Sequence, residues 1–135
     1  MKSATEVLFG PRLLKARAGP AAGKGRGVFA TAAIEPGEII DVCPCVELDA
    51  QTCSRILDTR IDDYYFQHPA DDERGLLVLG LASLCNHSDD ANANTCYEHD
   101  PALGWLVVLT VARRILPGEE VTRRYACAPW FATAA

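Results

Sequence analysis

Two Pro-Gly turns divide the sequence into short segments and limit what the chain can fold into. They lie at Pro36-Gly37 and Pro117-Gly118, and in each an apolar residue stands two places before the proline and a strand-like run follows. Proline fixes φ at one turn position and glycine accepts the positive φ of the next, so each pair favours a sharp reversal between strands. The likeness of the two turns does not establish an internal repeat. Because the other apolar runs are also short, the pattern predicts a mainly β fold.

The segments between these turn signals give the expected secondary structure. Residues 6–18 alternate partly between apolar and polar and predict an opening strand or hairpin, interrupted at Gly10-Pro11. Residues 50–66 carry spaced apolar side chains and are the best helix candidate, with poor periodicity. Further strands are expected at residues 27–31, 38–42 (or on to 48), 76–81, 94–100, 104–115 and 119–125.

The composition is that of one folded domain. The chain has 135 residues, 49% hydrophobic and 23% charged, which suits a single unit over residues 1–135 and excludes the composition of disordered chains. The net charge of −5 argues against sequence-independent DNA binding and is compatible with a basic protein partner. No apolar run reaches membrane-spanning length, and no secretory signal is indicated. We therefore expect an intracellular protein, cytoplasmic or nuclear, with no membrane and no direct nucleic-acid partner.

Six cysteines raise the question of disulfides or zinc. Only two of them are close in sequence, and neither a second close pair nor a secretory context is present. We therefore expect reduced cysteines that pack as small hydrophobic residues, with zinc as the alternative. The six are Cys43, Cys45, Cys53, Cys85, Cys96 and Cys127.

A glycine-rich stretch is the first candidate site. Gly23, Gly25 and Gly27 can let backbone groups approach a ligand closely, because glycine has no Cβ. The stretch lacks the Gly-Lys-Ser/Thr ending of a nucleotide P-loop and the spacing of a dinucleotide-binding fingerprint. Taken alone, it is better explained as a turn that leads into a strand.

The triplet Asn86-His87-Ser88 is the second candidate. Adjacent residues rarely orient one another as a nucleophile and its base, so a hydrolase is disfavoured. His87, His99 and the cysteines lack the usual ligand spacing, so no metal site is predicted. The structural alternative is that Asn86 and Asn92 cap turns and satisfy buried backbone groups.

Aromatic residues are the third candidate. Tyr125 closes the run after the second Pro-Gly turn, and Tyr64 lies in the middle of the chain. Such residues commonly pack in a core, but aromatic walls also suit a cation or a methylated ammonium group.

The order of these motifs resembles that of the SET-domain protein-lysine methyltransferases. The family's first motif is Gly-x-Gly before an apolar strand, matched at residues 25–30. The second is Asn-His-Ser-x-x-Pro-Asn, matched at residues 86–92 with Ala91 in place of proline. The third is Gly-Glu-Glu-Leu-Thr-x-x-Tyr, matched at residues 118–125 with Val121 in place of leucine. The chain looks most similar to short, stand-alone SET proteins of bacteria and chlorella viruses, over about residues 8–131.

This resemblance implies a mainly β SET-domain (β-clip) fold of short strands in small sheets, with one short helix. Such folds thread their C-terminal segment beneath the Asn-His-Ser region in a pseudoknot-like arrangement, which would bring Tyr125 next to Asn86 and His87. We expect none of the cysteine-rich zinc modules that precede or follow the domain in many relatives. A homodimer is a further expectation, since the viral relative is dimeric.

The resemblance also implies an activity. S-adenosylmethionine would be the cofactor, and its methyl group would pass to a lysine side-chain amine in a protein or peptide, with histone tails as candidates. Tyr125 and Tyr64 would be the catalytic residues. The substrate channel would be lined by Tyr64, Arg123, Trp130 and Phe131. The cofactor would be bound by Lys24, Gly25, Arg26, Gly27, Asn86, His87 and Tyr125.

Arg123 is the main departure from the family pattern. Many relatives place an aromatic or aliphatic residue two positions before the tyrosine, where it tunes how many methyl groups fit. A long cation there either points outward or restricts the channel. The chain could therefore be an active enzyme or a degenerate module that binds cofactor or peptide without catalysis. The least favoured alternative is a β domain with no ligand.

Overall fold

The computed structural model describes residues 3–11 and 13–124, and within them nine strands join in one sheet system. The strand order is β1-β2-β9-β7-β8-β3-β5-β4, and β6 pairs with β9 outside this path. The fold is therefore mainly β, as predicted. The strands are β1 (Ala16–Ala21), β2 (Gly25–Ala30), β3 (Ile39–Leu48), β4 (Tyr65–Gln67), β5 (Gly75–Val78), β6 (Asn86–His87), β7 (Ala93–Asp100), β8 (Gly104–Val111) and β9 (Glu120–Arg123).

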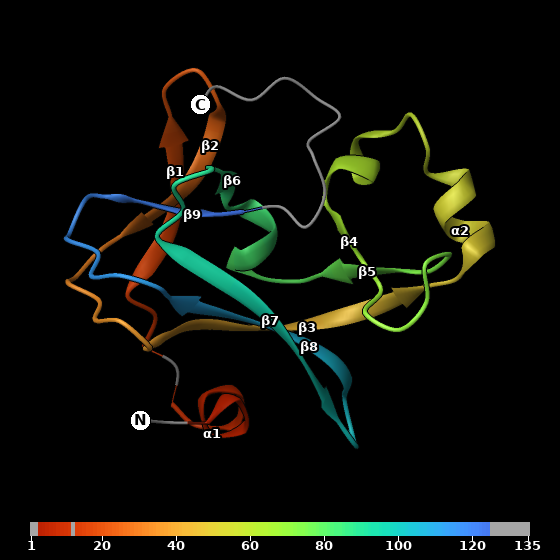
Figure 1. Ribbon diagram of the computed structural model, residues 1–135, viewed down its shortest axis with the longest axis horizontal. Coiled ribbons are helices and arrows are strands. Elements are labelled where there is room, and N and C mark those ends of the chain that lie inside the picture. Colours follow the sequence, from red (N-terminus) through yellow and green to blue (C-terminus); the bar gives the residue numbers. More distant parts are fainter. Residues whose placement is uncertain (1–2, 12, 125–135) are drawn as a thin grey trace.

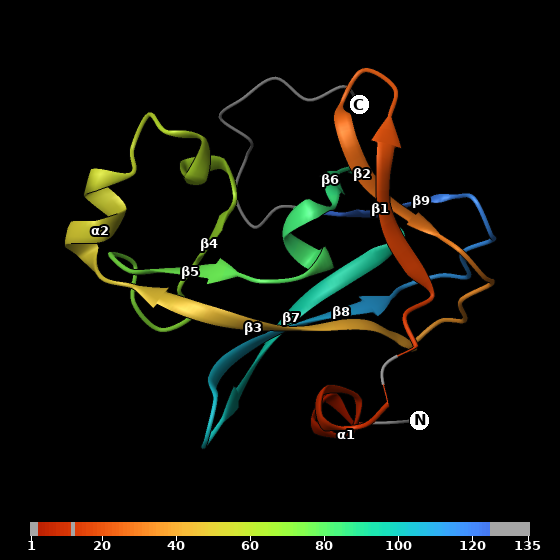
Figure 2. The ribbon, with the colours of Figure 1, turned by 180° about the vertical axis from the view of Figure 1, so that it is seen from behind.

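The two ends of the sheet are built from different segments of the chain (Figure 1). Strands β1, β2 and β9 lie at one end, and the other end holds β5 and β4 together with the helix α2 (Ala50–Arg55). The long strands β3, β7 and β8 run between them, and the β7–β8 hairpin extends away from the body in both views (Figure 2). The 3₁₀ turn η2 (Leu81–Leu84) lies between the two ends, directly before β6. Any site between the ends is thus built from segments far apart in sequence.

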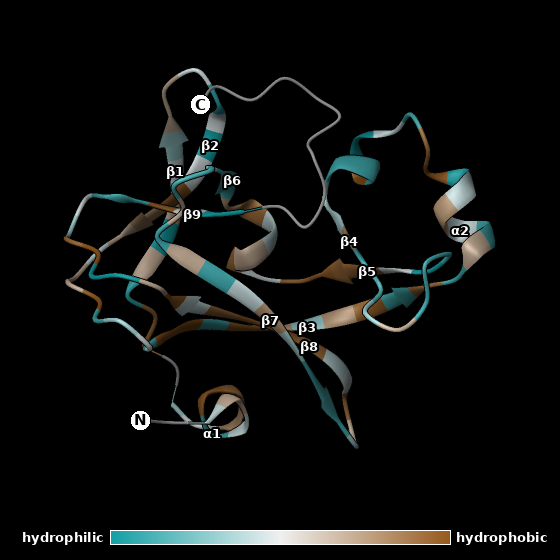
Figure 3. Cartoon of the chain, viewed as in Figure 1, coloured by the Kyte–Doolittle hydropathy of each residue, from teal (hydrophilic) through white to brown (hydrophobic). Residues whose placement is uncertain are grey.

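One large apolar core holds these strands together. Val28, Leu76, Leu109 and Val121 are fully buried in it, and they come from four different strands. Apolar residues are prominent along β3, β5 and β8, whereas the outer end of β7 is hydrophilic (Figure 3). Burying such side chains is the main stabilising contribution, about 1.5–3 kcal/mol for each.

The N-terminal segment forms a helix, and the predicted opening strand or hairpin over residues 6–18 is wrong in its first half. Helix α1 spans Ala4–Phe9, and the side chain of Ser3 caps it by accepting the N–H of Glu6 at 3.2 Å. Ala4, Val7 and Leu8 face a small second core on β3 and β8. Their spacing is that of a helix face, which the partial alternation obscured. The strand expected in the second half begins only at Ala16 and continues as β1 to Ala21, so residues 13–15 are not part of it.

The predicted helix at residues 50–66 is also shorter than expected. Only α2 is α-helical; Asp49 caps it by accepting the N–H of Thr52 at 2.7 Å. Asp58 then adopts a positive φ of 63°, which interrupts any helix. A short 3₁₀ turn, η1 (Arg60–Asp63), follows and leads into β4. In β4, Tyr65 and Phe66 pair with Leu77 and Leu76 of β5, and Phe66 is buried in the core.

The two Pro-Gly turns behave as predicted, and they also contact each other. Gly37 and Gly118 have φ values of 85° and 89°, which only glycine adopts readily. The apolar residues before the two prolines, Ile34 and Ile115, are fully buried and exchange two backbone hydrogen bonds of 2.9 Å. The likeness of the two turns therefore reflects two equivalent positions side by side.

The described cysteines are reduced, and most are shielded from solvent. Cys43, Cys53 and Cys85 are buried, whereas Cys96 is exposed on β7. Burial raises the pKa of Cys85 to about 12 and that of Cys45 to about 11. A thiol with a raised pKa forms little of the reactive thiolate at neutral pH.

Alkylation should therefore discriminate among these thiols. With iodoacetamide at about pH 8, we expect the folded protein to be labelled at Cys96 well before Cys85 or Cys45. Peptide mass spectrometry, with a urea-unfolded sample as the control, measures this order. Equal labelling of Cys85 and Cys96 in the folded protein would contradict the burial described here.

Among the described residues, no helix is long and apolar enough to cross a membrane.

Candidate active site

Strand β9 brings the three sequence motifs together. It pairs in parallel with β6, so that Asn86 lies opposite Thr122 and His87 lies opposite Arg123. It also pairs antiparallel with β2, which places Phe29 opposite Glu120. The glycine motif, the Asn-His motif and the Glu-Glu motif thus occupy neighbouring strands.

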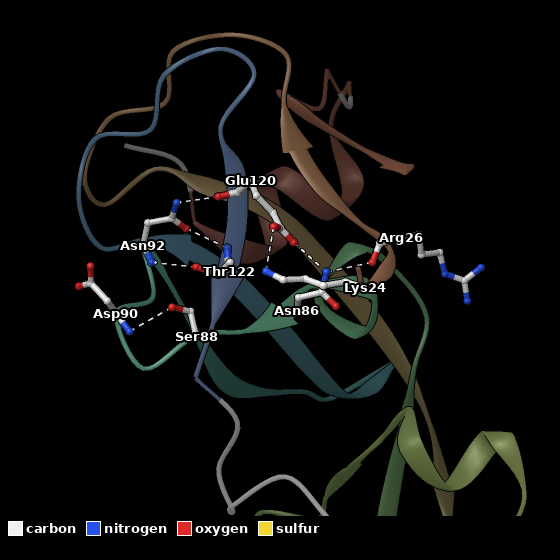
Figure 4. Close-up of polar contacts among 8 residues, drawn as sticks. All are labelled: Lys24, Arg26, Asn86, Ser88, Asp90, Asn92, Glu120 and Thr122. Atoms are coloured by element: carbon white, nitrogen blue, oxygen red, sulfur yellow. Dashed lines mark hydrogen bonds and ion pairs between the residues drawn. The ribbon is translucent and has the colours of Figure 1, made fainter. Parts of the chain in front are cut away.

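A polar cluster connects these strands at one point (Figure 4). The Asn86 side-chain amide donates to the carbonyl of Arg26 at 2.9 Å and to a Glu120 carboxylate oxygen at 2.7 Å. The other Glu120 oxygen lies 3.3 Å from Nζ of Lys24. Both charged side chains are about one-fifth exposed, so this ion pair is partly desolvated. We call Lys24, Asn86 and Glu120 the polar cluster.

The orientation of the Asn86 amide follows from these contacts. Both of its acceptors need an N–H, so Nδ2 must face them and Oδ1 must face away. Among the residues that the structure describes, nothing donates to Oδ1. Asn86 therefore offers an acceptor beside the Lys24 ammonium and the Glu120 carboxylate.

The two glycines of the first motif are needed for different reasons. A Cβ on Gly27 would lie 2.5 Å from Oε2 of Glu120 and 2.8 Å from Nδ2 of Asn86, so only glycine leaves room for the polar cluster. Gly25 has open space around it, but its φ of 78° disfavours a side chain. The interpretation of this stretch as a plain turn thus fails to account for Gly27.

Asn92 serves the structural role considered for it. It is buried, its amide donates to the carbonyl of Glu120 at 2.8 Å, and its Oδ1 accepts the N–H of Thr122 at 2.9 Å. This side chain therefore holds β9 in register from the loop before β7. In that loop, Ser88 Oγ accepts the N–H of Asp90 at 3.1 Å, as expected of a turn residue.

His87 is held mainly through its backbone in β6 and through one carboxylate. Its Nε2 lies 2.9 Å from Oδ1 of Asp89, and its side chain is only 9% exposed. The backbone of the next residue is also fixed, since the N–H of Ser88 donates to the carbonyl of Arg123 at 3.1 Å. The backbone around His87 is therefore fixed against β9.

The substrate-channel residues are only partly described. Tyr64 follows η1, is 39% exposed, and lies beneath the guanidinium of Arg26 at 5.8 Å from its ring centre. Arg123 points into the interior, 4.1 Å from the ring centre of Phe66. Tyr125, Trp130 and Phe131 lie outside the described residues, so their predicted roles stay predictions.

The sequence alone does not indicate a role for Glu120. It is the second glutamate of the third motif, and its two oxygens join Lys24 and Asn86, which are 62 residues apart in the chain. The only signal in the sequence was the match to that motif, which says nothing about its partners.

Comparisons with known proteins agree with this arrangement. The family model for the SET domain matches residues 25–126, which is most of the chain. The chain therefore belongs to the SET-domain family. Among curated protein sequences, none matches it.

Solved structures give the same fold. A Plasmodium falciparum protein described as a candidate histone methyltransferase is 26% identical with a TM-score of 0.70, over 88% of this chain and 99% of that chain. Polycomb repressive complex 2 of Chaetomium thermophilum, in an autoinhibited conformation bound to S-adenosylmethionine, is 21% identical with a TM-score of 0.70, over 84% of this chain. An active polycomb repressive complex 2 in the stimulated state gives 20% identity and a TM-score of 0.73 over 90%. This chain spans only 15% and 16% of those two polycomb chains.

Proposed function

We propose that this chain is a protein-lysine N-methyltransferase that uses S-adenosylmethionine. The observation that carries the proposal is the polar cluster, which joins the turn before β2 to β6 and β9 and assembles all three SET motifs. The last of these strands ends at Arg123, two residues before Tyr125. Family membership, rather than composition, supports the reaction type.

The polar cluster suits the amino-acid end of the proposed cofactor. That end carries an ammonium group and a carboxylate, and the site offers a carbonyl acceptor on Asn86, an anion on Glu120 and a cation on Lys24. The space at Gly27 lets this cluster lie against the backbone of β2. When bound, S-adenosylmethionine supplies a methyl group activated by a sulfonium.

The protein's own contribution is to position and to manage charge. Transfer to a lysine amine breaks the sulfur–methyl bond as the nitrogen–methyl bond forms, so alignment contributes much of the rate. The amine must be neutral to attack, and desolvation against aromatic side chains lowers the pKa of an ammonium group. We assign Tyr64 to one wall of this channel and the hydroxyl of Tyr125 to orienting the amine.

The charge distribution supports a basic substrate. The whole chain has a net charge of −5, and its acidic residues are concentrated in residues 45–103, which contain twelve Asp and Glu but only three Arg. Eight of these twelve lie in residues 45–78, which include α2, η1, β4 and β5. Asp63, Asp71, Asp72 and Glu73 are exposed there, beside the segment that bears Tyr64. A lysine-rich peptide would meet complementary charge on this side.

Substrate binding should therefore weaken with salt. We expect KM for a lysine-rich peptide to rise several-fold between about 50 and 300 mM salt, because exposed charges are screened over about 8 Å at physiological ionic strength. The KM for the cofactor should change less, since the polar cluster is partly buried. Steady-state kinetics at each salt concentration measures both, and a salt-independent peptide KM would contradict an electrostatic role for this surface.

The activity itself is tested by incubating the purified protein with methyl-labelled S-adenosylmethionine and mixtures of basic proteins. The proposal predicts label in protein lysines. Protein that binds the cofactor but transfers no label to any mixture would refute catalysis and leave a binding module. Protein that does not bind the cofactor, seen as no rise in melting temperature, would refute the site assignment as well.

A further inference from the structure

Two arginine–aromatic contacts join the two ends of the sheet. Arg26 on β2 lies over Tyr64, and Arg123 on β9 lies over Phe66. Arg26 and Arg123 come from the paired strands β2 and β9, at the end of the sheet that holds the polar cluster. Tyr64 and Phe66 are two positions apart in the chain and lie at the other end of the sheet. Both contacts therefore tie the segment that carries Tyr64 to the strands that carry the polar cluster.

The contact of Arg123 is the tighter one. Its guanidinium is 4.1 Å from the Phe66 ring centre, against 5.8 Å for Arg26 and Tyr64. Phe66 is buried at 7% exposure, whereas Tyr64 is 39% exposed. A cation over an aromatic face gains more where water is excluded. Stacking on Phe66 should therefore hold Arg123 more firmly than Tyr64 holds Arg26.

Further bonds fix Arg123 from its side chain and its backbone. Nε donates to the carbonyl of Ala82 in η2 at 3.1 Å, and the backbone carbonyl accepts the N–H of Ser88. Its charge also reaches the buried Cys85 thiol, where it opposes the rise in pKa that burial causes. Arg123 thus contacts β4, η2 and the Asn-His-Ser loop from the last position of β9.

We propose that Arg123 is a positioning residue that sets the end of β9 against β4 and η2. The proposal rests on the proposed function, because the backbone it fixes leads directly into Tyr125. The planar guanidinium serves two purposes here, since it stacks on Phe66 and donates from Nε at the same time. Arg123 thereby fixes the spacing between the cofactor-binding strands and the wall that carries Tyr64.

Exchange of Arg123 for methionine tests this role, with Arg124 as the matched control. Arg124 is the next residue and is exposed, so R124M removes the same charge without the internal contact. We expect R123M to lower kcat about tenfold while the KM for the cofactor stays within about twofold. R124M should keep kcat within about twofold of the wild type. R123K retains the cation over Phe66 but not the planar fork, so it should recover part of the loss.

Two results would overturn the proposal. One is an R123M kcat within about twofold of that of R124M. The other is a fractional loss of activity in R123M that equals the fraction of R123M protein that is unfolded, with no recovery of activity in R123K. Such a result would mean that Arg123 only stabilises the fold.

Amide hydrogen exchange separates this proposal from the proposed function. In R123M, but not in R124M, residues 65–67 and 81–84 should exchange faster. If the wild type transfers no methyl group, the proposed function fails, and this exchange result still decides whether Arg123 fixes these segments. If the wild type is active and neither kcat nor exchange responds to R123M, only the positioning role fails.

Discussion

Replacement of Tyr125 by phenylalanine is expected to lower kcat for methyl transfer on the order of 100-fold, the effect of removing one well-placed polar group at a reacting centre. The hydroxyl is assigned to orienting the lysine amine, and phenylalanine keeps the ring but loses that group. Affinity for the cofactor should fall by less than about tenfold, since one neutral hydrogen bond contributes about 0.5–1.5 kcal/mol. Steady-state kinetics and calorimetric binding measure the two effects separately.

Tyr97 provides the matched control for this variant. Its hydroxyl donates to the backbone carbonyl of Gln67 at 3.1 Å, so Y97F makes the same chemical change at a described tyrosine outside the proposed machinery. We expect Y97F to keep kcat within about threefold of the wild type. If Y125F and Y97F have the same turnover, Tyr125 has no part in the mechanism.

Substitution of Gly27 by alanine should weaken cofactor binding by about tenfold or more, because overpacking commonly costs about 1–3 kcal/mol. The new Cβ would meet Oε2 of Glu120 at 2.5 Å and Nδ2 of Asn86 at 2.8 Å. Those two atoms are hydrogen-bonded to each other, so relieving the clash separates Asn86 from Glu120. It also releases the Lys24 side chain, which Glu120 holds by an ion pair. Isothermal titration with S-adenosylmethionine measures the loss.

Gly19 offers the control for this substitution. It is the residue opposite Gly27 on β1, and a Cβ there would meet only the Phe29 ring closely, at 3.3 Å from Cδ2. G19A therefore adds the same atom beside the same strand without touching the polar cluster. Cofactor affinity lost equally in G19A and G27A would show that the strand pair, and not the cluster, is what the added methyl group disturbs.

The strands and turns were predictable because their signals are local. A Pro-Gly pair favours a tight turn in which the glycine takes a positive φ, and Gly37 and Gly118 both do so. The apolar runs after them became β3 and β9. The order of three short motifs was also enough to predict the family and the fold.

The remaining features depend on contacts between distant segments. Nothing near Glu120 in the sequence indicates that Asn86 and Lys24 will reach it, because their meeting requires β9 to lie between β2 and β6. The direction of Arg123 was open for the same reason, since Phe66 and Ala82 reach it from other elements. Helix α1 was missed because its six residues gave too short a period to distinguish from a strand.

Identification of the residue that receives the methyl group tests the proposed lysine methylation most directly. The protein would be incubated with S-adenosylmethionine and a basic peptide that contains one lysine, or with the same peptide carrying arginine at that position. Tandem mass spectrometry would locate any added methyl group. We expect methylation of the lysine peptide alone, with loss of the signal in Y125F. Methylation of the arginine peptide, or none of either peptide or of the basic protein mixtures by protein that demonstrably binds the cofactor, would contradict the proposed lysine methylation.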